Sequence, residues 1–239
     1  MKTFLYGRNA VRSRLINNQV YKLFIRNNFQ DQEILILAKE QGIDIEFCQN
    51  SVLNEMVKSD KHQGVVALIE RFAYTPLDDL IAYSKSQSKP FLLLLAGLED
   101  PHNLGAIART ADAFSVDGII IPKDRSVQVT GAALKVATGA FDFVKVSQVT
   151  NLNQTLTTLK KAGYWIVGAE GESDTNYMDL SYDFPLVLII GSEGKGVPKL
   201  LLKNSDYRVK IPMTGHVNSL NASVATAILI AGIIQKREN

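Results

Sequence analysis

The chain of 239 residues is poor in the residue types that cross-link proteins or bind metals. Its one cysteine, Cys48, leaves no internal disulfide, and its three histidines are scattered without metal-ligand spacing. No run of about 18 apolar residues occurs, and the first residues contain no apolar signal-peptide core. We therefore expect no metal and no membrane span, with the cytoplasm as the default compartment.

Acidic residues are missing from the first 30 positions, which contain six cations: Lys2, Arg8, Arg12, Arg14, Lys22 and Arg26. From residue 90 onward, 14 Lys and Arg balance 14 Asp and Glu, so the net charge of +2 arises earlier in the chain. Arg8 and Arg12 are four residues apart on an expected helix, which places two guanidinium groups on one face. With Asn9, they predict an RNA-binding surface. An ordinary solvated surface is the alternative.

Helical and extended patterns alternate in the first part of the chain, which is typical of a small α/β layer structure. We expect helices at 8–16, 32–41 and 51–58, and strands at 21–26, 43–48 and 65–70. Apolar periodicity stops around Thr75, Pro76 and the polar run Ser84 to Lys89. The sequence therefore predicts a first domain at 1–75, a linker at 76–89 with one short helix at 77–83, and a second domain at 90–239.

The second domain contains apolar strings of strand length with little alternation. They begin at Phe91 and continue at 118–122, 143–146, 164–169, 186–191 and 207–212. Strands without alternation are buried on both faces, which indicates a mostly parallel sheet covered by helices. In such α/β sheets, ligands bind outside the carboxyl ends of the strands.

Three segments that follow these strands have the composition of binding loops. The first is Leu98 to Phe114, where Pro101 is expected to end the strand and a helix to begin by Asn103. Arg109 lies six residues after Asn103, so we expect both to face one cleft. Because its neighbours are small, Arg109 should be partly enclosed and need an anionic or carbonyl partner. A salt bridge to Asp100 or Asp112 is the alternative.

The second segment, LVLIIGSEGKGV, ends a strand in three glycines, Gly191, Gly194 and Gly196, with Glu193 among them. Glycines let a backbone approach a ligand closely. The segment has neither the GxGxxG pattern nor the P-loop pattern, so it predicts neither a dinucleotide site nor a nucleoside triphosphatase. A plain strand-to-helix turn is the alternative.

The third segment, Ile211 to Ala231, joins a polar loop to an apolar helix. The loop contains Thr214, Gly215, His216, Asn218 and Ser219. In the simpler interpretation, one of Asn218, Ser219 or Asn221 merely caps the helix. Three strand-end loops in one domain predict convergence on one ligand.

The segments NLGAIAR (103–109), IIGSEGKGV and IPMTGHVNSLNASVATAI resemble, in order and spacing, the three motifs of the SpoU (TrmH) family of RNA ribose 2′-O-methyltransferases. The stretches YGRNAV and HQGVVA resemble the L30e-like RNA-binding domain of its larger ribosomal members. The resemblance implies a SPOUT α/β domain with a deep trefoil knot, a homodimer, and S-adenosylmethionine as cofactor.

Site residues follow from the same resemblance. It assigns cofactor binding to backbone groups of Gly191, Ile211 and Leu220, with Ser192, Gly196 and Met213 as further lining. A ribose hydroxyl attacks only when its proton is removed or strongly hydrogen-bonded. In the expected catalytic set, Arg109 binds phosphate and polarises the hydroxyl, Asn103 orients Arg109 or the ribose, Glu193 fixes the loop and the arginine, and Ser219 and Asn221 hold the ribose.

The implied activity is methylation of a guanosine 2′-hydroxyl in the peptidyl-transferase region of 23S ribosomal RNA. Alternatives within the enzyme class are a tRNA guanosine 2′-O-methyltransferase and a resistance-type enzyme that modifies an adenosine in ribosomal RNA. An alternative from another class is a non-catalytic RNA-binding assembly factor. The presence of Arg109, Glu193 and Asn221 argues against the last of these.

Overall fold

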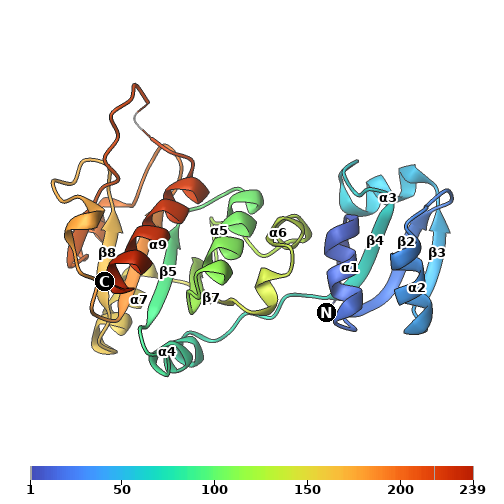
Figure 1. Ribbon diagram of the computed structural model, residues 1–239, viewed down its shortest axis with the longest axis horizontal. Coiled ribbons are helices and arrows are strands. Elements are labelled where there is room, and N and C mark those ends of the chain that lie inside the picture. The colour runs from blue at the N-terminus through green and yellow to red at the C-terminus, as the bar shows by residue number, and fades with distance from the viewer. Residues whose placement is uncertain (1, 218, 239) are drawn as a thin grey trace. The chain divides into compact units, whose positions relative to one another are not determined.

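The structure is a computed structural model that describes residues 2–217 and 219–238. It divides into two compact units, which are drawn together in Figure 1. Unit 1 is Met1–Ala73 with Val129–Gly139, and unit 2 is Tyr74–Gln128 with Ala140–Asn239. No helix in the described part of the chain is long and apolar enough to cross a membrane.

Unit 1 is a four-stranded sheet with helices. Its elements are β1 (Lys2–Tyr6), α1 (Arg8–Ile16), β2 (Val20–Arg26), α2 (Gln32–Glu40), β3 (Asp44–Cys48), α3 (Asn50–Val57), β4 (Val65–Glu70) and α6 (Gly131–Ala137). The strand order is β1-β4-β2-β3, with β4 antiparallel to both neighbours and β2 parallel to β3. The alternating pattern predicted every element of 8–70 to within about two residues, but it missed β1.

The grouping of α6 with unit 1 differs from the expected domain division. Residues 129–139 lie within the range assigned to the second domain, yet they cluster with the first unit. The contact is close, because a Cβ added at Gly131 would lie 2.4 Å from the carbonyl oxygen of Phe4 in β1. Sequence patterns do not predict this contact, since more than a hundred residues separate the two positions.

Unit 2 is built on a six-stranded, fully parallel sheet with the order β10-β8-β9-β5-β6-β7. Its elements are α4 (Leu77–Lys85), β5 (Phe91–Ala96), α5 (Pro101–Ala113), β6 (Gly118–Pro122), β7 (Lys145–Val149), α7 (Leu152–Lys161), β8 (Trp165–Ala169), β9 (Leu186–Gly191), α8 (Lys199–Lys203), β10 (Tyr207–Val209) and α9 (Ala222–Glu238), with short 3-10 turns at Ala140–Asp142 and Tyr177–Asp179. The predicted α/β class and parallel sheet are confirmed.

Both faces of this sheet are buried, as the continuous apolar strands predicted. Every residue of β5 is buried, and alternate residues such as Leu92 and Leu94 pack with Leu156 and Leu159 of α7. The other alternate residues point to the opposite face. Helices α5 and α9 pack on each other and cover that face (Figure 1). The sheet and its two helical layers therefore hold the strand-end loops in fixed positions.

The short helix expected at 77–83 is present as α4, but it packs into unit 2 and does not act as a linker. Helix α4 occupies 77–85, and its Leu80 is fully buried in the core of unit 2. A Cβ added at Gly118 would lie 2.5 Å from Leu80 Cδ1, so the absence of a side chain there makes room for the helix. Ser84 Oγ also donates a 2.6 Å hydrogen bond to Asp117 Oδ2, which fixes the end of α4.

The boundary after β5 also differs from the prediction. The strand ends at Ala96, and Pro101 is the first residue of α5 rather than the end of the strand. Asp100 caps the helix by accepting a hydrogen bond from the backbone nitrogen of His102 at 2.8 Å. Proline suits the first helical position because the backbone N–H it lacks would have no partner there. The helix therefore begins two residues earlier than expected.

The far end of α9 is fastened by a buried arginine. The Arg237 guanidinium donates to the carbonyl oxygens of Lys89 at 2.9 Å, Phe184 at 2.8 Å and Tyr182 at 3.1 Å. A buried guanidinium without partners would be strongly destabilising, so these acceptors are needed. With this end fixed, the N-terminus of α9 has a defined place at the carboxyl edge of the sheet.

Candidate active site

Three loops at the carboxyl edge of the parallel sheet are joined by hydrogen bonds between their side chains. Helix α5 follows β5 and carries Asn103, the turn after β9 carries Glu193, and Asn221 precedes α9. Strands β5 and β9 are neighbours in the sheet, so their loops lie side by side. The chain returns from the edge strand β10 to bring Asn221 to both of them. The predicted convergence of the three segments is therefore seen in the structure.

Glu193 is the centre of this network. Its Oε1 accepts hydrogen bonds from Asn103 Nδ2 and from Asn221 Nδ2, the latter at 2.9 Å. Asn221 Nδ2 also donates to Asn103 Oδ1 at 3.1 Å. The backbone nitrogen of Ala222, at the start of α9, lies 3.5 Å from the same carboxylate oxygen. Glu193 therefore also contacts the first turn of α9.

Asn221 is both the cap of α9 and a bridge between loops. Its Oδ1 accepts hydrogen bonds from the backbone nitrogen of Ser223 at 2.9 Å and from Ser223 Oγ at 2.6 Å. The two hydrogens on its Nδ2 are directed to Glu193 and Asn103. An amide offers two donor hydrogens, so none remains for a ribose. We therefore revise the expected ribose contact: Asn221 is a positioning residue, and the simpler capping interpretation is also correct.

Replacing Asn221 separates these two roles. We expect Asn221→Ala to lower the free energy of unfolding by about 1 kcal/mol through loss of the cap, and to lower methyl transfer as well. Asn221→Ser is the matched control, because serine also caps helices but cannot bridge Glu193 and Asn103. It should recover most of the stability, measured by denaturant unfolding, without recovering the methylation rate. Recovery of both by serine would show that the bridge is not needed.

The turn after β9 folds back tightly on the end of the strand. Gly196 N donates to Ser192 O at 2.9 Å, and the same two residues form an isolated antiparallel bridge. A Cβ at Gly191 would lie 2.0 Å from the carbonyl carbon of Gly196, so only glycine fits there. Gly194 and Gly196 have φ values of +79° and +65°, a region that favours glycine. The segment is a tight turn, as the plain-turn interpretation held, and backbone groups form the surface of this turn.

The residues around this turn fit an S-adenosylmethionine site. A Cβ at Gly196 would meet no atom within 4 Å, so open space adjoins the backbone of the turn. Gly191 and Ser192 are half-buried, as are Ile211 and Leu220 in the loop that leads to α9, whereas Met213 is 39% exposed. These residues present backbone donors and acceptors together with apolar surface at one edge of the sheet, which is what a cofactor with adenine and methionine parts requires.

Arg109 differs from its expected environment. Its side chain is exposed, and it makes no hydrogen bond or ion pair with the described residues, including Asp100 and Asp112. A helix turns by roughly 100° per residue, so six residues place Arg109 roughly 120° around α5 from Asn103. The expected enclosure and the expected contact with Asn103 and Glu193 are therefore wrong. The guanidinium is instead free to meet a ligand from outside the chain.

The remaining polar residues of the third segment are also open to solvent. Ser219 is exposed and makes no hydrogen bond to the described residues. Thr214, Gly215 and His216 are exposed as well, whereas Asn218 lies outside the described residues. In the described part of the chain, no group of three or more His, Cys, Asp or Glu side chains is placed to hold a metal ion.

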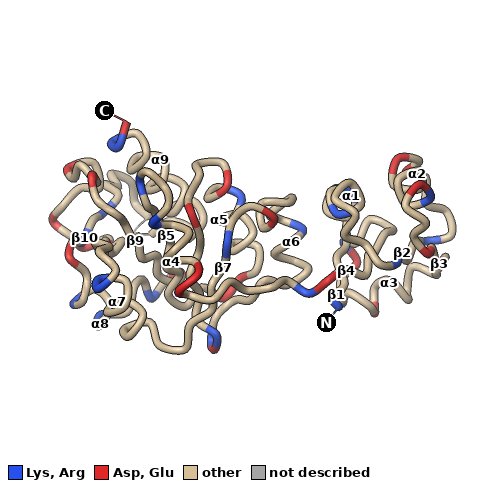
Figure 2. Tube along the Cα trace, turned by 90° about the horizontal axis from the view of Figure 1, so that it is seen from below, with Lys and Arg blue, Asp and Glu red and all other residues tan. Residues whose placement is uncertain are grey.

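The cations of unit 1 do not form the surface that the sequence predicted. Arg12 is paired with Asp31 Oδ2 at 3.2 Å and with Glu33 Oε2 at 2.9 Å, and it also contacts Asn9 Oδ1 at 3.4 Å. Lys22 lies 2.9 Å from both Asp44 and Glu46. Figure 2 shows acidic positions beside basic ones on α2 and around β3. Arg12 is therefore engaged with two acids and with Asn9, whereas Arg8 has no carboxylate partner among the described residues.

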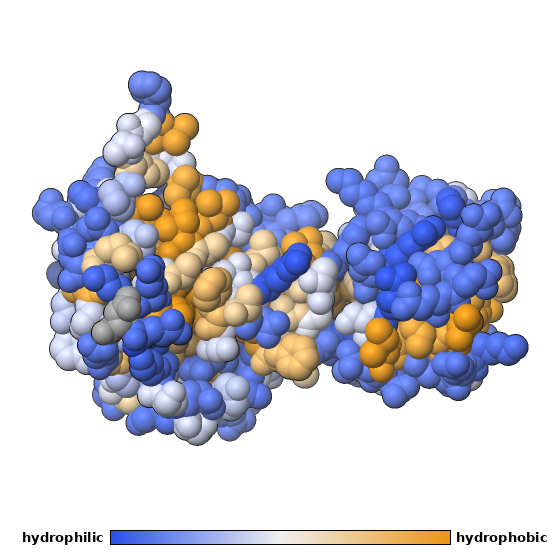
Figure 3. All heavy atoms as spheres, viewed as in Figure 1, coloured by the Kyte–Doolittle hydropathy of each residue, from blue (hydrophilic) through white to orange (hydrophobic). Residues whose placement is uncertain are grey.

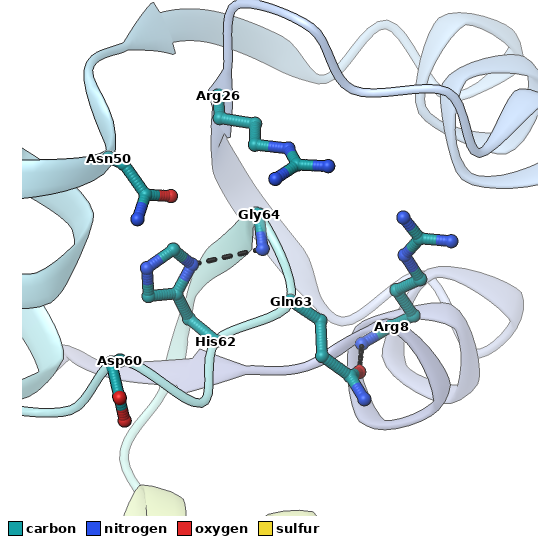
Figure 4. Close-up of a pocket in the computed structure, with 7 residues that line it drawn as sticks. All are labelled: Arg8, Arg26, Asn50, Asp60, His62, Gln63 and Gly64. Atoms are coloured by element: carbon teal, nitrogen blue, oxygen red, sulfur yellow. Dashed lines mark hydrogen bonds between the residues drawn. The ribbon is translucent and has the colours of Figure 1, made fainter.

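Arg8 instead faces a cavity that Arg26 also lines. Arg26 was not among the predicted RNA-binding residues. The cavity is about 400 Å³ and is lined by Arg8, Arg26, Asn50, Asp60, His62, Gln63 and Gly64 (Figure 4). Among the described residues, neither arginine has a carboxylate partner. One wall is formed by His62, Gln63 and Gly64, which belong to the HQGVVA stretch of the family resemblance. Nothing in the sequence connects that stretch with Arg26.

His62 holds the wall of this cavity in a neutral form. It is 1% exposed, and its Nδ1 accepts a hydrogen bond from Gly64 N at 3.0 Å. Its Nε2 lies 2.8 Å from Asn54 Oδ1, so the proton resides on Nε2. Burial lowers the pKa of His62 below 6.5, and the positive charge of Arg26 lowers it further.

The pH dependence of unit 1 follows from this depressed pKa. Because the unfolded chain binds the proton more readily, His62 contributes stability that is present above pH 6.5 and is lost as the pH falls through its folded pKa. We expect the Nε2–H tautomer and a pKa below 6.5 in a nitrogen-detected NMR titration of the imidazole rings. Titration at or above 6.5 would contradict the assignment.

Two family models cover the chain in the same order as the two units. The model of the SpoU rRNA Methylase family matches residues 90–231, and that of the RNA 2′-O ribose methyltransferase substrate-binding domain matches residues 4–75. The chain belongs to the SpoU (TrmH) family. The expectation of an S-adenosylmethionine-dependent RNA methyltransferase is thereby confirmed at the level of the family.

Relatives of this SpoU protein match nearly its whole length. A protein of Staphylococcus haemolyticus assigned to the TrmH family of tRNA/rRNA methyltransferases is 43% identical over 98% of this chain and 95% of its own. YacO of Bacillus subtilis, assigned to the same family, is also 43% identical, over 98% of this chain and 96% of its own. Both units are therefore shared with these relatives.

Solved structures share the fold of both units. The SpoU methyltransferase AviRb from Streptomyces viridochromogenes, in complex with AdoMet, matches with a TM-score of 0.80 at 20% identity and covers 99% of this chain and 91% of its own. An AdoMet-bound rRNA methyltransferase from Sinorhizobium meliloti matches with a TM-score of 0.78 at 23% identity, over 99% and 88%. At these identities the likeness concerns the fold alone.

Proposed function

We propose that this protein transfers a methyl group from S-adenosylmethionine to the ribose 2′-hydroxyl of a guanosine in the peptidyl-transferase region of 23S ribosomal RNA. The observation that carries the proposal is the Asn103–Glu193–Asn221 network beside the glycine turn, with Arg109, which has no ion pair to the described residues, on the same helix as Asn103. A rigid framework next to a free cation suits a reaction that depends on positioning an anionic substrate. With ribosomal RNA as its substrate, the reaction in this proposal takes place in the cytoplasm.

Some residues of the site hold the cofactor, and others position the RNA or the loops. The cofactor supplies the methyl group on a sulfonium. Backbone groups of Gly191, Ile211 and Leu220 would hold it, with Ser192, Gly196 and Met213 as lining. Arg109 binds a phosphate of the RNA and polarises the 2′-hydroxyl, and Ser219 contacts the ribose. Asn103, Glu193 and Asn221 keep the three loops in register.

The presence of unit 1 favours ribosomal RNA over tRNA. The TrmH/SpoU tRNA-modifying enzyme from A. aeolicus, with a TM-score of 0.58 and 28% identity, covers 68% of this chain. The AdoMet-bound rRNA methyltransferase from Sinorhizobium meliloti covers 99% of it. A structured ribosomal RNA target needs a recognition surface beyond the methyl-transfer site, and unit 1 supplies one. In this proposal residues 1–75 recognise the RNA and residues 90–239 carry out methyl transfer.

We further propose that the protein acts as a homodimer. Figure 3 shows apolar surface over α9, and Val224 on that helix is 47% exposed. Contiguous exposed apolar surface commonly marks an interface. The deep trefoil knot implied by the family resemblance stays a prediction.

The substrate is tested by methyl transfer from labelled S-adenosylmethionine to 23S ribosomal RNA and to total tRNA, each free of protein and unmodified. We expect label in 23S RNA and almost none in tRNA. Labelling of tRNA alone would favour the tRNA methyltransferase instead. Cofactor-independent RNA binding with no label in either RNA would favour the assembly factor.

A further inference from the structure

The cavity of unit 1 has the size and position of a binding site. Its volume of about 400 Å³ falls in the range of roughly 300–1,000 Å³ typical of small-molecule sites. Its walls come from the first residue of α1, the last of β2, the first of α3 and the turn before β4. Four elements therefore meet around it, which gives it a defined shape.

Two guanidinium groups with no carboxylate partner among the described residues converge on this cavity. Arg8 lies with its Cζ atom 5.3 Å from the centre of the Phe29 ring, which orients it. Arg26 packs its side chain against Gly64, where a Cβ would lie 2.9 Å from Arg26 Cδ. Figure 4 shows both guanidinium groups toward the same space, with the Asp60 carboxylate directed away from them. Arg12 and Lys22 of the same unit are paired with carboxylates, whereas these two guanidinium groups have no carboxylate partner among the described residues, which suits an anionic ligand.

Neutral hydrogen-bonding groups also line the cavity. The Asn50 side chain makes no hydrogen bond to the described residues, so its amide is available as both donor and acceptor. Gln63 Oε1 accepts from Arg8 N at 2.8 Å, which leaves its Nε2 group as a donor. A base, with donors and acceptors on its edge, could use these two amides, whereas a bare phosphate needs only the arginines.

The wall that carries Gln63 is preorganised. Gln63 and Gly64 both have positive φ, at +58° and +82°, and the buried His62 holds the turn through Gly64 N and Asn54. A strained turn that persists in a structure must be held by its surroundings. Gln63 therefore keeps its place when the cavity is empty.

We propose that this cavity binds one unstacked nucleotide of the RNA substrate, with its phosphate between Arg8 and Arg26 and its base edge against Asn50 and Gln63. The inference rests on the proposed function, because it takes RNA as the substrate. It gives unit 1 a specific recognition role: the RNA is read at a nucleotide that is turned out of the helix, apart from the methylated ribose.

The test measures affinity of the full-length protein for protein-free 23S ribosomal RNA at several salt concentrations. Arg8→Gln and Arg26→Gln should each lower affinity on the order of tenfold and reduce the slope of log affinity against log salt by about 0.7 to 1. Arg26→Lys should keep the slope, since it keeps the charge. Asn50→Ala should lower affinity by about fivefold or more with an unchanged slope, because it removes a base contact and no ion pair.

Lys39→Gln is the matched control, because Lys39 is exposed on α2 of the same unit and does not line the cavity. It should change affinity by less than about twofold. Cofactor affinity and melting temperature should be unchanged in all of these variants. Arginine variants that behave like Lys39→Gln, or an Asn50→Ala variant of wild-type affinity, overturn the proposal.

The two proposals fail in different ways. If the wild-type protein methylates 23S RNA but the cavity variants bind it normally, only the nucleotide site is wrong. If the wild-type protein neither binds nor methylates the RNA, the proposed function fails, and the nucleotide site with it.

Discussion

Arg109→Ala should lower the rate of methyl transfer to ribosomal RNA by about 100-fold or more, the loss typical of removing one donor that stabilises charge developing in the transition state. The arginine is exposed and makes no hydrogen bond or ion pair to the described residues, so its removal should cost little stability. The rate is measured with labelled S-adenosylmethionine at saturating RNA, and cofactor affinity by calorimetry. Cofactor affinity should stay within about twofold of the wild type, because the glycine turn and the Glu193 network are intact.

Two further variants make the Arg109 result specific. Arg109→Lys keeps the charge but not the planar fork of donors, and we expect only partial activity. Lys161→Ala removes an exposed cation from α7 of the same unit and should have nearly normal activity. Near-normal methylation by Arg109→Ala, with intact cofactor binding, would refute the catalytic role of Arg109.

Gly191→Ala should abolish or strongly weaken cofactor binding. The added Cβ would lie 2.0 Å from Gly196 C, 2.2 Å from Gly196 O and 2.2 Å from Val197 N, so the turn must move. Overpacking of this kind typically costs about 1–3 kcal/mol, which corresponds to roughly five- to 150-fold in affinity if the cost falls on the binding conformation. Isothermal calorimetry with S-adenosylmethionine measures this directly.

A second glycine supplies the control for this substitution. Gly171 lies in another loop of unit 2, where an added Cβ meets no atom within 4 Å and φ is not positive. Gly171→Ala should bind the cofactor as the wild type does. If Gly191→Ala binds normally too, the turn after β9 does not hold the cofactor.

The strands of unit 2 were predictable because a strand that is buried on both faces consists mainly of apolar residues. The run Phe91 to Ala96 contains no polar residue, and it is the fully buried strand β5. Strand ends were harder to place: 143–146 was expected where β7 spans 145–149, and 207–212 where β10 stops at Val209. Ends depend on which neighbouring strand supplies hydrogen bonds, and composition does not contain that information.

The candidate site was predictable in its members but not in their contacts. Asn103, Glu193 and Asn221 were selected from their loops, and the structure joins them by hydrogen bonds. The hydrogen-bond partner of each side-chain amide could not be predicted, because it depends on how the loops approach one another in space. Asn221 was therefore expected at the ribose, whereas its donors are directed to Glu193 and Asn103.

The cations of unit 1 show how a linear count of charges misleads. The first 30 residues lack acids, yet Arg12 is neutralised by Asp31 and Glu33 at the start of α2. Arg26, at the end of a strand, joins Arg8 only because β2 ends beside the His62–Gly64 turn, where Arg26 N donates to Gly64 O at 3.0 Å. Pairing across the sheet decides which charges remain free.

The central claim is that this SpoU protein methylates a guanosine ribose, and nucleoside analysis of its product tests it most directly. The full-length protein is incubated with unmodified 23S ribosomal RNA and S-adenosylmethionine, and the RNA is then digested to nucleosides for mass spectrometry. The proposed function predicts 2′-O-methylguanosine, mapped to the peptidyl-transferase region by protected fragments. A methyl group on a base, or 2′-O-methyladenosine as the sole product, would contradict it.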